Sequence, residues 1–292
     1  MIVGLRETPS ARRGLAAIPR GPIGRAGRGG TIKDGDVNRE QRLVFGEVAE
    51  LYDRYRPGYP AAVFDEVVAF GQLEPGARVL EVGAGTGKAT AALVGRGLLV
   101  TALEPSPEMA AVARCQLQGA SGWQVVEQGF EAWDPSGRSF DLLLAAQSWH
   151  WVMPEVGYPK AARILTPEGT LALMWNRPRL DPDPVTSEIE RVYRALVPSL
   201  TAGPPGERQI DRSSELERSG HFDSVKVCQF SWDLEYSARD YRALLLTQSD
   251  HRMLAPDLRD RLLAAVEDVI ASSGRPYRVG YRTIVYLGRP RS

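Results

Sequence analysis

The sequence contains little cysteine, histidine or lysine. Two cysteines, Cys115 and Cys228, are too few for a disulfide framework, and three scattered histidines show no metal-ligand spacing. No stretch approaches the roughly 18 consecutive apolar residues that would span a bilayer, and the N-terminus lacks the apolar core of a secretory signal. We therefore expect a cytoplasmic protein with no bound metal and no membrane partner.

The charges balance overall but are unevenly distributed. The chain has 36 basic and 36 acidic residues, yet residues 1–33 hold six Arg and one Lys against a single acid, Glu7. The remainder is therefore acidic, which disfavours nucleic acid as a partner. Residues 1–38 are rich in Arg and Gly and lack periodicity, so we predict a disordered tail there. An arm that binds RNA or a membrane is the less favoured alternative for this segment.

Short apolar runs alternate with helical patterns through the middle of the chain. Strands are predicted at 78–82, 98–103, 123–127, 140–146 and 170–175, with helices near 88–95, 107–117 and 155–165 and a weak helical candidate at 131–136. Strands that alternate with crossover helices form a parallel sheet covered on both faces. The pattern therefore predicts an α/β, doubly wound fold.

The regular alternation of strand and helix patterns ends after Asn176. Residues 177–222 are Pro-rich and then helical, whereas 223–233 is strand-like and Tyr281–Leu287 predicts a final strand. Helical patterns also occupy much of 237–275. We interpret 177–222 and 237–275 as helical insertions that cap the open edge of the sheet within one folded domain, residues 39–292.

A glycine-rich segment links the first strand of this pattern to a helix. From Arg78 to Lys88 the sequence reads Arg-Val-Leu-Glu-Val-Gly-Ala-Gly-Thr-Gly-Lys. The three glycines, Gly83, Gly85 and Gly87, allow the backbone to turn tightly and to approach a ligand. The helix that follows offers unpaired backbone N–H groups. By itself such a turn fits a nicotinamide cofactor, a phosphate or no ligand.

Two acidic residues and the position of the third glycine distinguish between these possible ligands. The dinucleotide pattern G-x-G-x-x-G fails because Lys88 stands at its last position. Glu81, inside the strand, would repel a pyrophosphate, but it can receive the amino group of a methionine moiety. Glu104 ends the next strand, 21 residues after Gly83. In this topology an acid at that place accepts hydrogen bonds from a ribose diol.

Taken together, these segments resemble the class I S-adenosylmethionine-dependent methyltransferases. The closer resemblance is to the bacterial small-molecule branch of the trans-aconitate and ubiquinone methyltransferases, and it covers Phe45 to Asn176. The matching segments are a lid (Phe45–Pro60, within 40–60), the cofactor loop (79–87), the fourth strand with its extension (140–151) and the turn into strand five (165–171). The resemblance implies a methyltransferase domain over 39–292, with a Rossmann-like, seven-stranded mixed sheet whose last strand is antiparallel.

The resemblance also implies S-adenosylmethionine as the cofactor. The residues expected to bind it are Tyr52, Arg56, Glu81, Gly83, Gly85, Thr86, Gly87, Glu104, Pro105, Phe130, Glu131, Ala146 and Gln147. Glu81 and the glycine loop would hold the methionine end, and Glu104 would hold the ribose. Tyr52 and Arg56 would close over the cofactor, with Arg56 pairing the methionine carboxylate.

The remaining expected contacts include two departures from the family pattern. Phe130 and Glu131 would bracket the adenine, although Phe130 stands where the family usually has an Asp or a similar polar residue. Ala146 or Gln147 would lie beneath the sulfonium. Lys88 stands where the family often has a neutral polar residue.

The segment Ser148-Trp149-His150-Trp151 follows the fourth strand, at the edge where ligands bind in such sheets. His150 is the candidate general base, because an imidazole titrates near neutrality; the alternative is a histidine that only packs or shapes the pocket. In an extended chain Trp149 and Trp151 would share one face. These rings, with Trp175 and Tyr158, would form an aromatic floor, although some of them are expected to fill the core instead.

The sequence therefore predicts a methyltransferase that modifies an oxygen, nitrogen or carbon atom of a small molecule. An aromatic or heteroaromatic metabolite, such as an indole, is favoured because the site edge is rich in rings. The alternatives are an NAD(P)-dependent oxidoreductase, a methyltransferase fold that binds the cofactor without transfer, and a nucleic-acid methyltransferase. The last is disfavoured because the Asn/Asp-Pro-Pro-aromatic motif is missing after the fourth strand.

Overall fold

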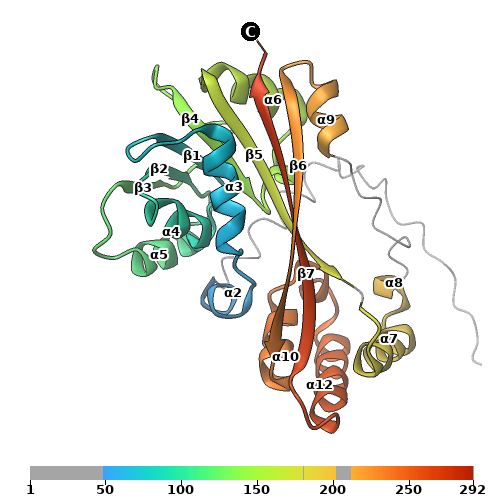
Figure 1. Ribbon diagram of the computed structural model, residues 1–292. Helices are drawn as coiled ribbons and strands as arrows, with labels where there is room; N and C mark the ends of the chain where they lie inside the picture. The colour runs from blue at the N-terminus through green and yellow to red at the C-terminus, as the bar shows by residue number, and fades with distance from the viewer. Residues whose placement is uncertain (1–48, 180, 202–211, 292) are drawn as a thin grey trace, which may run out of the picture.

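A computed structural model describes residues 49–179, 181–201 and 212–291 (Figure 1). The predicted tail, residues 1–38, and the first part of the predicted lid, residues 40–48, lie outside the described residues. The ribbon shows a sheet flanked by helices and a second, helical lobe at one end of the longest strands.

Seven strands form one mixed sheet in the order β3-β2-β1-β4-β5-β7-β6. The strands are β1 (Arg78–Val82), β2 (Leu99–Leu103), β3 (Trp123–Val126), β4 (Phe140–Ala146), β5 (Leu165–Arg179), β6 (Phe222–Tyr236) and β7 (Tyr277–Pro290). Neighbours among β1 to β5 pair in parallel, whereas β7 is antiparallel to both β5 and β6. The predicted seven-stranded sheet with an antiparallel last strand is confirmed.

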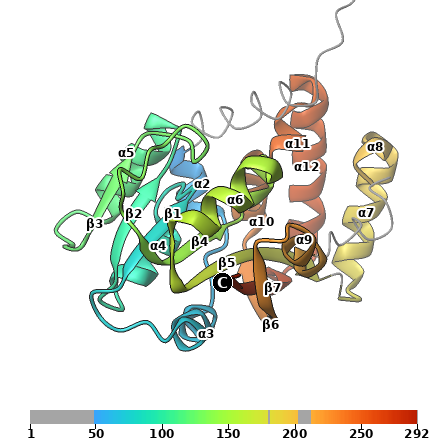
Figure 2. The ribbon, with the colours of Figure 1, turned by 90° about the horizontal axis from the view of Figure 1, so that it is seen from above.

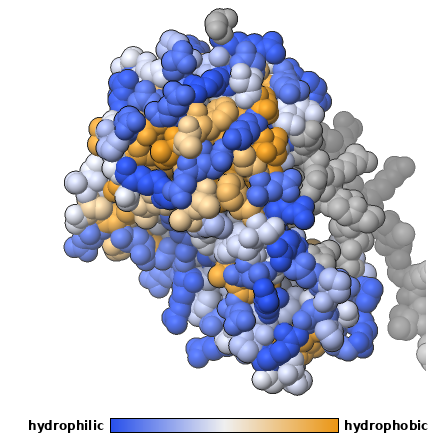
Figure 3. All heavy atoms as spheres, in the orientation of Figure 1, coloured by the Kyte–Doolittle hydropathy of each residue, from blue (hydrophilic) through white to orange (hydrophobic). Residues whose placement is uncertain are grey.

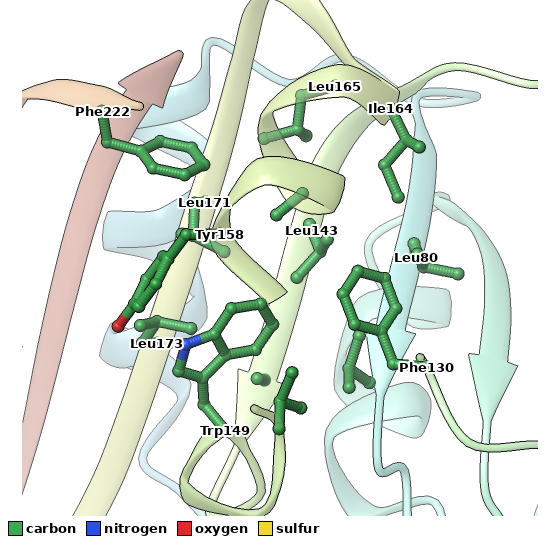
Figure 4. Packing of buried hydrophobic residues seen from close by; sticks show 14 of the residues in the cluster. Leu80, Phe130, Leu143, Trp149, Tyr158, Ile164, Leu165, Leu171, Leu173 and Phe222 are labelled. Carbon is green, nitrogen blue, oxygen red and sulfur yellow. The ribbon is translucent and has the colours of Figure 1, made fainter. Parts of the chain in front are cut away.

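The two faces of this sheet bury alternate residues of the same strands. On β4, Leu142 and Leu144 pack with α3 (Ala61–Gly71) and α4 (Lys88–Val94). Leu143, between them, points to the opposite face, against α6 (Pro154–Ile164) and the large rings shown in Figure 4. Figure 2 shows α3 and α6 on opposite sides of the sheet. Burial on both faces explains why consecutive residues such as Leu142, Leu143 and Leu144 are all apolar.

The predicted crossover helices form, with one exception. The helix α5 (Pro107–Gln116) begins where expected, because the Ser106 hydroxyl accepts a hydrogen bond from the Met109 N–H. The weak candidate at 131–136 is wrong, since this stretch is a turn followed by irregular chain. A buried lysine from α6 binds the backbone carbonyls here, as described below.

The strands β5, β6 and β7 are longer than the sequence pattern predicted. Their far ends continue as one ladder, in which Arg177 pairs with Arg282 and Arg179 with Gly280. The expected boundary at residue 177 therefore falls inside a strand. The outer parts of these strands escaped prediction because their inward residues are tyrosines and their neighbours are charged or proline, a mixture that shows no simple alternation.

Helices pack around these far ends and form the second lobe, here called the cap. Its helices are α7 (Pro184–Leu196), α8 (Pro198–Thr201), α10 (Ala238–Leu246), α11 (Ser249–Arg252) and α12 (Pro256–Ser272). Their apolar stripes meet Tyr236, Tyr277 and Tyr281 in a core of their own. On the face shown in Figure 3 the cap surface is largely hydrophilic, and most apolar surface lies over the sheet. Within the described part of the chain, every helix is too short or too polar to cross a membrane.

Candidate active site

A cavity of about 470 Å³ opens at the carboxyl ends of β1, β2 and β4. It is lined by all of the residues predicted to bind the cofactor except Gly87, and by His150 and Trp151 of the predicted catalytic set. Gly87 instead precedes α4 as its N-cap, and a Cβ there would lie 3.2 Å from side-chain carbons of Ala113 and Leu117. The structure thus brings residues from widely separated segments to one place, at the edge where open α/β sheets bind ligands.

Two glycines of the loop after β1 adopt a left-handed backbone conformation, which other residues rarely adopt. Gly83 has a φ of +69°, and a Cβ there would lie 2.5 Å from the Cβ of Ser148. Gly85 has a φ of +58°, but a Cβ there would meet no atom within 4 Å, since this residue faces the open cavity. The first glycine therefore permits close packing of two strand ends, and the second leaves backbone exposed to a ligand.

Glu104 is fixed at the end of β2 by backbone N–H groups. Its carboxylate accepts hydrogen bonds from the N–H of Gly85 at 2.7 Å and from the N–H of Ser106 at 2.9 Å. The side chain is buried but lines the cavity. A carboxylate oxygen can accept a second hydrogen bond. This geometry leaves Glu104 able to receive a pair of hydroxyl groups.

Glu81 lies deeper, at the base of the same loop. Only 1% of the residue is exposed, and its carboxyl accepts a hydrogen bond from the Thr90 hydroxyl at 2.6 Å. Burial raises the pKa of Glu81 to about 8, with the Thr90 hydrogen bond opposing the shift and the charge of Glu104 adding to it. A cationic group placed beside this carboxyl would stabilise its ionised form.

Thr86 carries a buried hydroxyl that makes no hydrogen bond with the described residues. Unsatisfied buried polar atoms are rare in proteins and call for an explanation. Because Thr86 lines the cavity between Gly85 and α4, a polar ligand group would satisfy its hydroxyl. Together with the two carboxyl groups, this donor fits a zwitterionic and hydroxyl-bearing molecule.

The helix α2 (Ala49–Tyr55) covers the cavity and is tied to both lobes. Lys88 donates a hydrogen bond to the Asp53 carbonyl, which gives a role to the lysine that departs from the family pattern. On the other side, Arg56 donates to the hydroxyl and the carbonyl of Thr247 on the cap, each at 2.8 Å. Arg56 lines the cavity as predicted, but at least two of its donors bind the cap instead of standing free for a carboxylate.

The segment after β4 is not extended, contrary to the prediction. Residues Trp149–Trp151 form a 3-10 turn, anchored by a hydrogen bond from the Ser148 hydroxyl to the Val82 carbonyl. The turn directs the Trp149 ring into the core, where it is 1% exposed and packs 5.4 Å from the ring of Tyr158. The expectation that Trp149 faces the site is therefore wrong. Tyr158 and Trp175 are also buried, which leaves Trp151 at the cavity.

Phe130, like Trp149, is a buried aromatic residue. It contributes to the cavity wall, but its ring is 2% exposed and lies 5.7 Å from the Trp149 ring. The Phe130 ring thus belongs to both the core and the cavity wall, and its contact with an adenine stays a prediction. Glu131, beside it, lines the cavity and accepts a hydrogen bond from the Met153 N–H at 3.3 Å.

Lys160 organises this wall from inside the protein. Its buried ammonium donates to the carbonyls of Phe130, Glu131 and Trp133, with the first bond at 2.6 Å. The ammonium also lies 5.0 Å from the centre of the Phe130 ring. Burial lowers the pKa of Lys160, and the nearby Arg163 lowers it further. These contacts explain why residues 130–133 turn where the sequence suggested a helix.

His150 lines the cavity, with its ring 4.7 Å from that of Trp151. The Trp175 indole N–H lies 3.4 Å from Nδ1 of His150 and donates to it. The residue is exposed at the cavity surface, but partial desolvation of its ring, followed by the charges of Arg212 and Arg177, lowers the pKa of His150 to about 4. At neutral pH the ring is therefore uncharged, and its proton lies on Nε2. In that form Nε2 donates a hydrogen bond. The geometry therefore favours His150 as a hydrogen-bond donor and not as a general base.

The cavity also includes residues that the sequence did not reveal. Asn176 of β5 donates to the Gly58 carbonyl at 2.8 Å, which fixes the chain between α2 and α3. The cap contributes Gln248, Ser249 and Asp250. These residues carry no motif, and only the position of Asn176 at the end of the family resemblance could have drawn attention to it. No cluster suited to a metal ion occurs among the described residues.

Comparisons with known proteins agree with this geometry. Residues 80–173 match the family model described as a methyltransferase domain. An uncharacterized methyltransferase of Mycobacterium tuberculosis is 42% identical over 140 residues, which cover 47% of this chain and 54% of the relative. The chain thus matches about half the length of this relative. An uncharacterized methyltransferase-like protein of Schizosaccharomyces pombe is 25% identical over 229 residues, covering 75% of this chain and 82% of that protein.

Solved structures extend the likeness to the fold. A candidate type II methyltransferase from Anaeromyxobacter dehalogenans has a TM-score of 0.58 at 21% identity and covers 80% of this chain and 98% of its own. The phosphoethanolamine N-methyltransferase 2 of Haemonchus contortus, solved with phosphomonomethylethanolamine and S-adenosylhomocysteine, has a TM-score of 0.51 at 13% identity, covering 89% of this chain and 61% of that chain. Residues 80–173 are therefore similar to a methyltransferase domain, and the chain has the fold of the class I, S-adenosylmethionine-dependent methyltransferases.

Proposed function

We propose that this protein is an S-adenosylmethionine-dependent methyltransferase that acts on a small molecule. The observation that carries the proposal is the placement of Glu81 and Glu104 on either side of one glycine loop, both lining a single cavity. One buried carboxyl suits a cationic amino group, and the other, held by backbone N–H groups, suits a ribose diol. The buried Thr86 hydroxyl offers a further polar contact between them.

When bound, the cofactor supplies a methyl group attached to a positively charged sulfur. A nucleophile displaces the sulfur from this methyl group in one step. The protein's task is to align the acceptor with that methyl group and to exclude water, which lowers the barrier by about 7–11 kcal/mol in favourable cases. Helix α2 covers the cavity, and the cap forms its other wall. Gln147, held at a φ of +60°, presents backbone at the site where the sulfonium is expected.

An oxidoreductase is the weaker interpretation of the same cavity. A dinucleotide pyrophosphate needs close backbone approach at the start of α4, yet Lys88 occupies the place of the required glycine and its ammonium binds the Asp53 carbonyl. Glu81 would also lie beneath the two phosphates. A small, ring-bearing acceptor remains our proposal, supported by the side chains of Trp151 and Tyr59 in the cavity wall.

Isothermal titration calorimetry with S-adenosylhomocysteine and with NAD tests the proposal. We expect S-adenosylhomocysteine to bind and NAD not to bind. Glu104→Ala should weaken binding by about 1.5–3 kcal/mol, because hydrogen bonds to a charged acceptor are lost. Glu74→Ala is a matched control, since Glu74 is exposed and lies outside the cavity. Binding of NAD without binding of S-adenosylhomocysteine would refute the proposal.

A further inference from the structure

A hydrogen-bonded chain in the cap ends at the cavity. Tyr193 of α7 contacts Nε2 of His251 at 2.5 Å, and Nδ1 of His251 contacts a carboxylate oxygen of Asp250 at 2.7 Å. The His251 backbone N–H binds the same oxygen, Oδ1, at 2.8 Å. Asp250 lines the cavity, whereas His251 is buried at 4% exposure. The chain thus connects the interior of the cap to the wall that faces the ligand.

The direction of each hydrogen bond follows from the chemistry of the groups. An ionised carboxylate only accepts, so Nδ1 of His251 carries the proton that binds Asp250. In the neutral imidazole, Nε2 is then an acceptor and receives the hydroxyl proton of Tyr193. The rings of Tyr193 and His251 also pack edge to face, with centroids 5.7 Å apart. The position of the Asp250 carboxylate is therefore set from behind by two helices.

This arrangement uses one oxygen of Asp250 and leaves the other available. The side chain is 53% exposed, and none of the described residues donates a hydrogen bond to Oδ2. Burial works against ionisation, but hydrogen bonds from His251 and the charge of Arg56 hold the pKa of Asp250 below its usual value. The cavity wall at the cap thus presents an oriented negative charge at neutral pH.

The cofactor contacts expected from the family do not include this wall. Those contacts come from the first four strands, their loops and α2, whereas Asp250 lies on α11 of the cap. The same cavity therefore contains an acceptor for hydrogen bonds beyond the ones that the cofactor is expected to use. Hydrogen-bond donors on a second molecule are the groups that would satisfy it.

We propose that Asp250 binds the methyl acceptor through an N–H or O–H group, and that His251 and Tyr193 are positioning residues that hold its carboxylate in place. This inference rests on the proposed methyltransferase function. The acceptor nitrogen or oxygen gives its lone pair to the methyl carbon, while the carbon–sulfur bond breaks and its electron pair stays on sulfur. The positive charge that develops on the acceptor lies beside Asp250, and the released proton passes through Oδ2 to water.

A purely structural role, in which the chain only fastens α11 to α7, makes different predictions. In that case a change at Asp250 would lower stability without selecting among ligands. The test therefore compares three probes that share one ring: benzylamine, benzyl alcohol and benzoate. Each is titrated into the protein saturated with S-adenosylhomocysteine at pH 7.5, and its Kd is measured by NMR.

We expect benzylamine and benzyl alcohol to bind and benzoate to bind at least about tenfold more weakly, because like charges repel at the wall. Benzylamine, which is protonated at pH 7.5, should bind more tightly than benzyl alcohol, because its ammonium group pairs with the Asp250 carboxylate. Asp250→Asn should weaken the favoured probe about tenfold or more, with the Kd for S-adenosylhomocysteine unchanged. Tyr193→Phe should weaken it about two- to fivefold, since the carboxylate keeps its direct contact with His251.

Asp257→Asn is the matched control, because Asp257 is an exposed acid on the same lobe that does not line the cavity. Equal binding of benzoate and benzylamine, or a favoured probe unaffected by Asp250→Asn, would overturn the inference while the methyltransferase proposal stands. A tenfold loss of S-adenosylhomocysteine affinity in Asp250→Asn would assign this carboxylate to the cofactor instead. Failure of wild-type protein to bind S-adenosylhomocysteine would overturn both proposals.

Discussion

The two walls of the cavity are built in different ways. The wall formed by β1, β2 and β4 consists of strand ends and a glycine loop, with Glu104 fixed by backbone N–H groups. The wall formed by the cap consists of single side chains, such as Asp250, carried on short helices. Backbone geometry restricts which residue can occupy each position of the first wall, so its sequence contains a recognisable motif. The sequence of the second wall contains no such motif, because many sequences form a cap helix.

Among the described residues, Arg56 joins the cap to the rest of the cavity by donating hydrogen bonds to the hydroxyl and the carbonyl of Thr247. The comparison therefore predicts that changes behind the first wall affect cofactor binding strongly. Changes at the contacts between the walls should affect it weakly.

Lys160→Met gives the largest expected effect on the first wall. Three backbone carbonyls lose their buried donor, so the free energy of unfolding should fall by about 2–4 kcal/mol, and the affinity for S-adenosylhomocysteine should fall with it. Urea unfolding and calorimetry measure the two quantities. Lys226→Met is the control, since Lys226 is exposed and pairs with Glu66 on the surface. Equal effects of the two variants would contradict the prediction.

The pH dependence of cofactor binding tests the deepest group of this wall. Below its pKa of about 8, Glu81 must lose a proton to receive an ammonium group, so affinity for S-adenosylhomocysteine should fall by about tenfold per pH unit from 8 to 6. The raised pKa has the opposite effect on the free protein, whose stability should decrease as pH rises from 4.5 towards 8. Calorimetry in buffers of different ionisation enthalpy should show proton release at pH 7. Glu81→Gln should abolish it; release that persists in this variant would assign the proton to another group.

The protonation state of His150 is expected to change little across the neutral pH range. Because its pKa is lowered to about 4, the ring should stay uncharged from pH 5.5 to 8, with its proton on Nε2. NMR titration of the imidazole measures both properties, and His150→Phe assigns its signals among the three histidines. A midpoint near 6–7, or a proton on Nδ1, would restore the general base that the sequence suggested. His150→Phe would then lower turnover by about 10²–10⁴.

The smallest effect is expected where the two walls meet. Thr247→Val removes one of the two acceptors for Arg56 and keeps the shape of the side chain, so the affinity for S-adenosylhomocysteine should fall by only about two- to threefold. Calorimetry measures this change. A loss of affinity of tenfold or more would show that cofactor binding at the first wall depends on the cap.

The sequence predicted the sheet and the glycine loop well, because strand periodicity and the positive φ angles of Gly83 and Gly85 are local properties. Where it failed, a distant group decided the local structure. Lys160 binds the carbonyls of residues 130–133, which prevents the weak helix predicted at 131–136. The anchor of Ser148 on Val82 turns the Trp149 ring into the core. Asp250 could not be found at all, since its role depends on His251 and Tyr193 in the folded cap.

The length of β5, β6 and β7 has a mechanical consequence. These strands run without interruption from the sheet into the cap, and their ladder continues through Arg179 and Gly280 (Figure 1). A cap carried on three hydrogen-bonded strands cannot swing as a hinged door, because bending would break several ladder bonds together. By contrast, the side-chain hydrogen bonds of α2 and of the adjoining Arg56 run to Lys88, Gln116 and Thr247, and none of them belongs to the sheet ladder. The position of the cap is therefore set by backbone pairing, whereas the position of α2 is set by side chains.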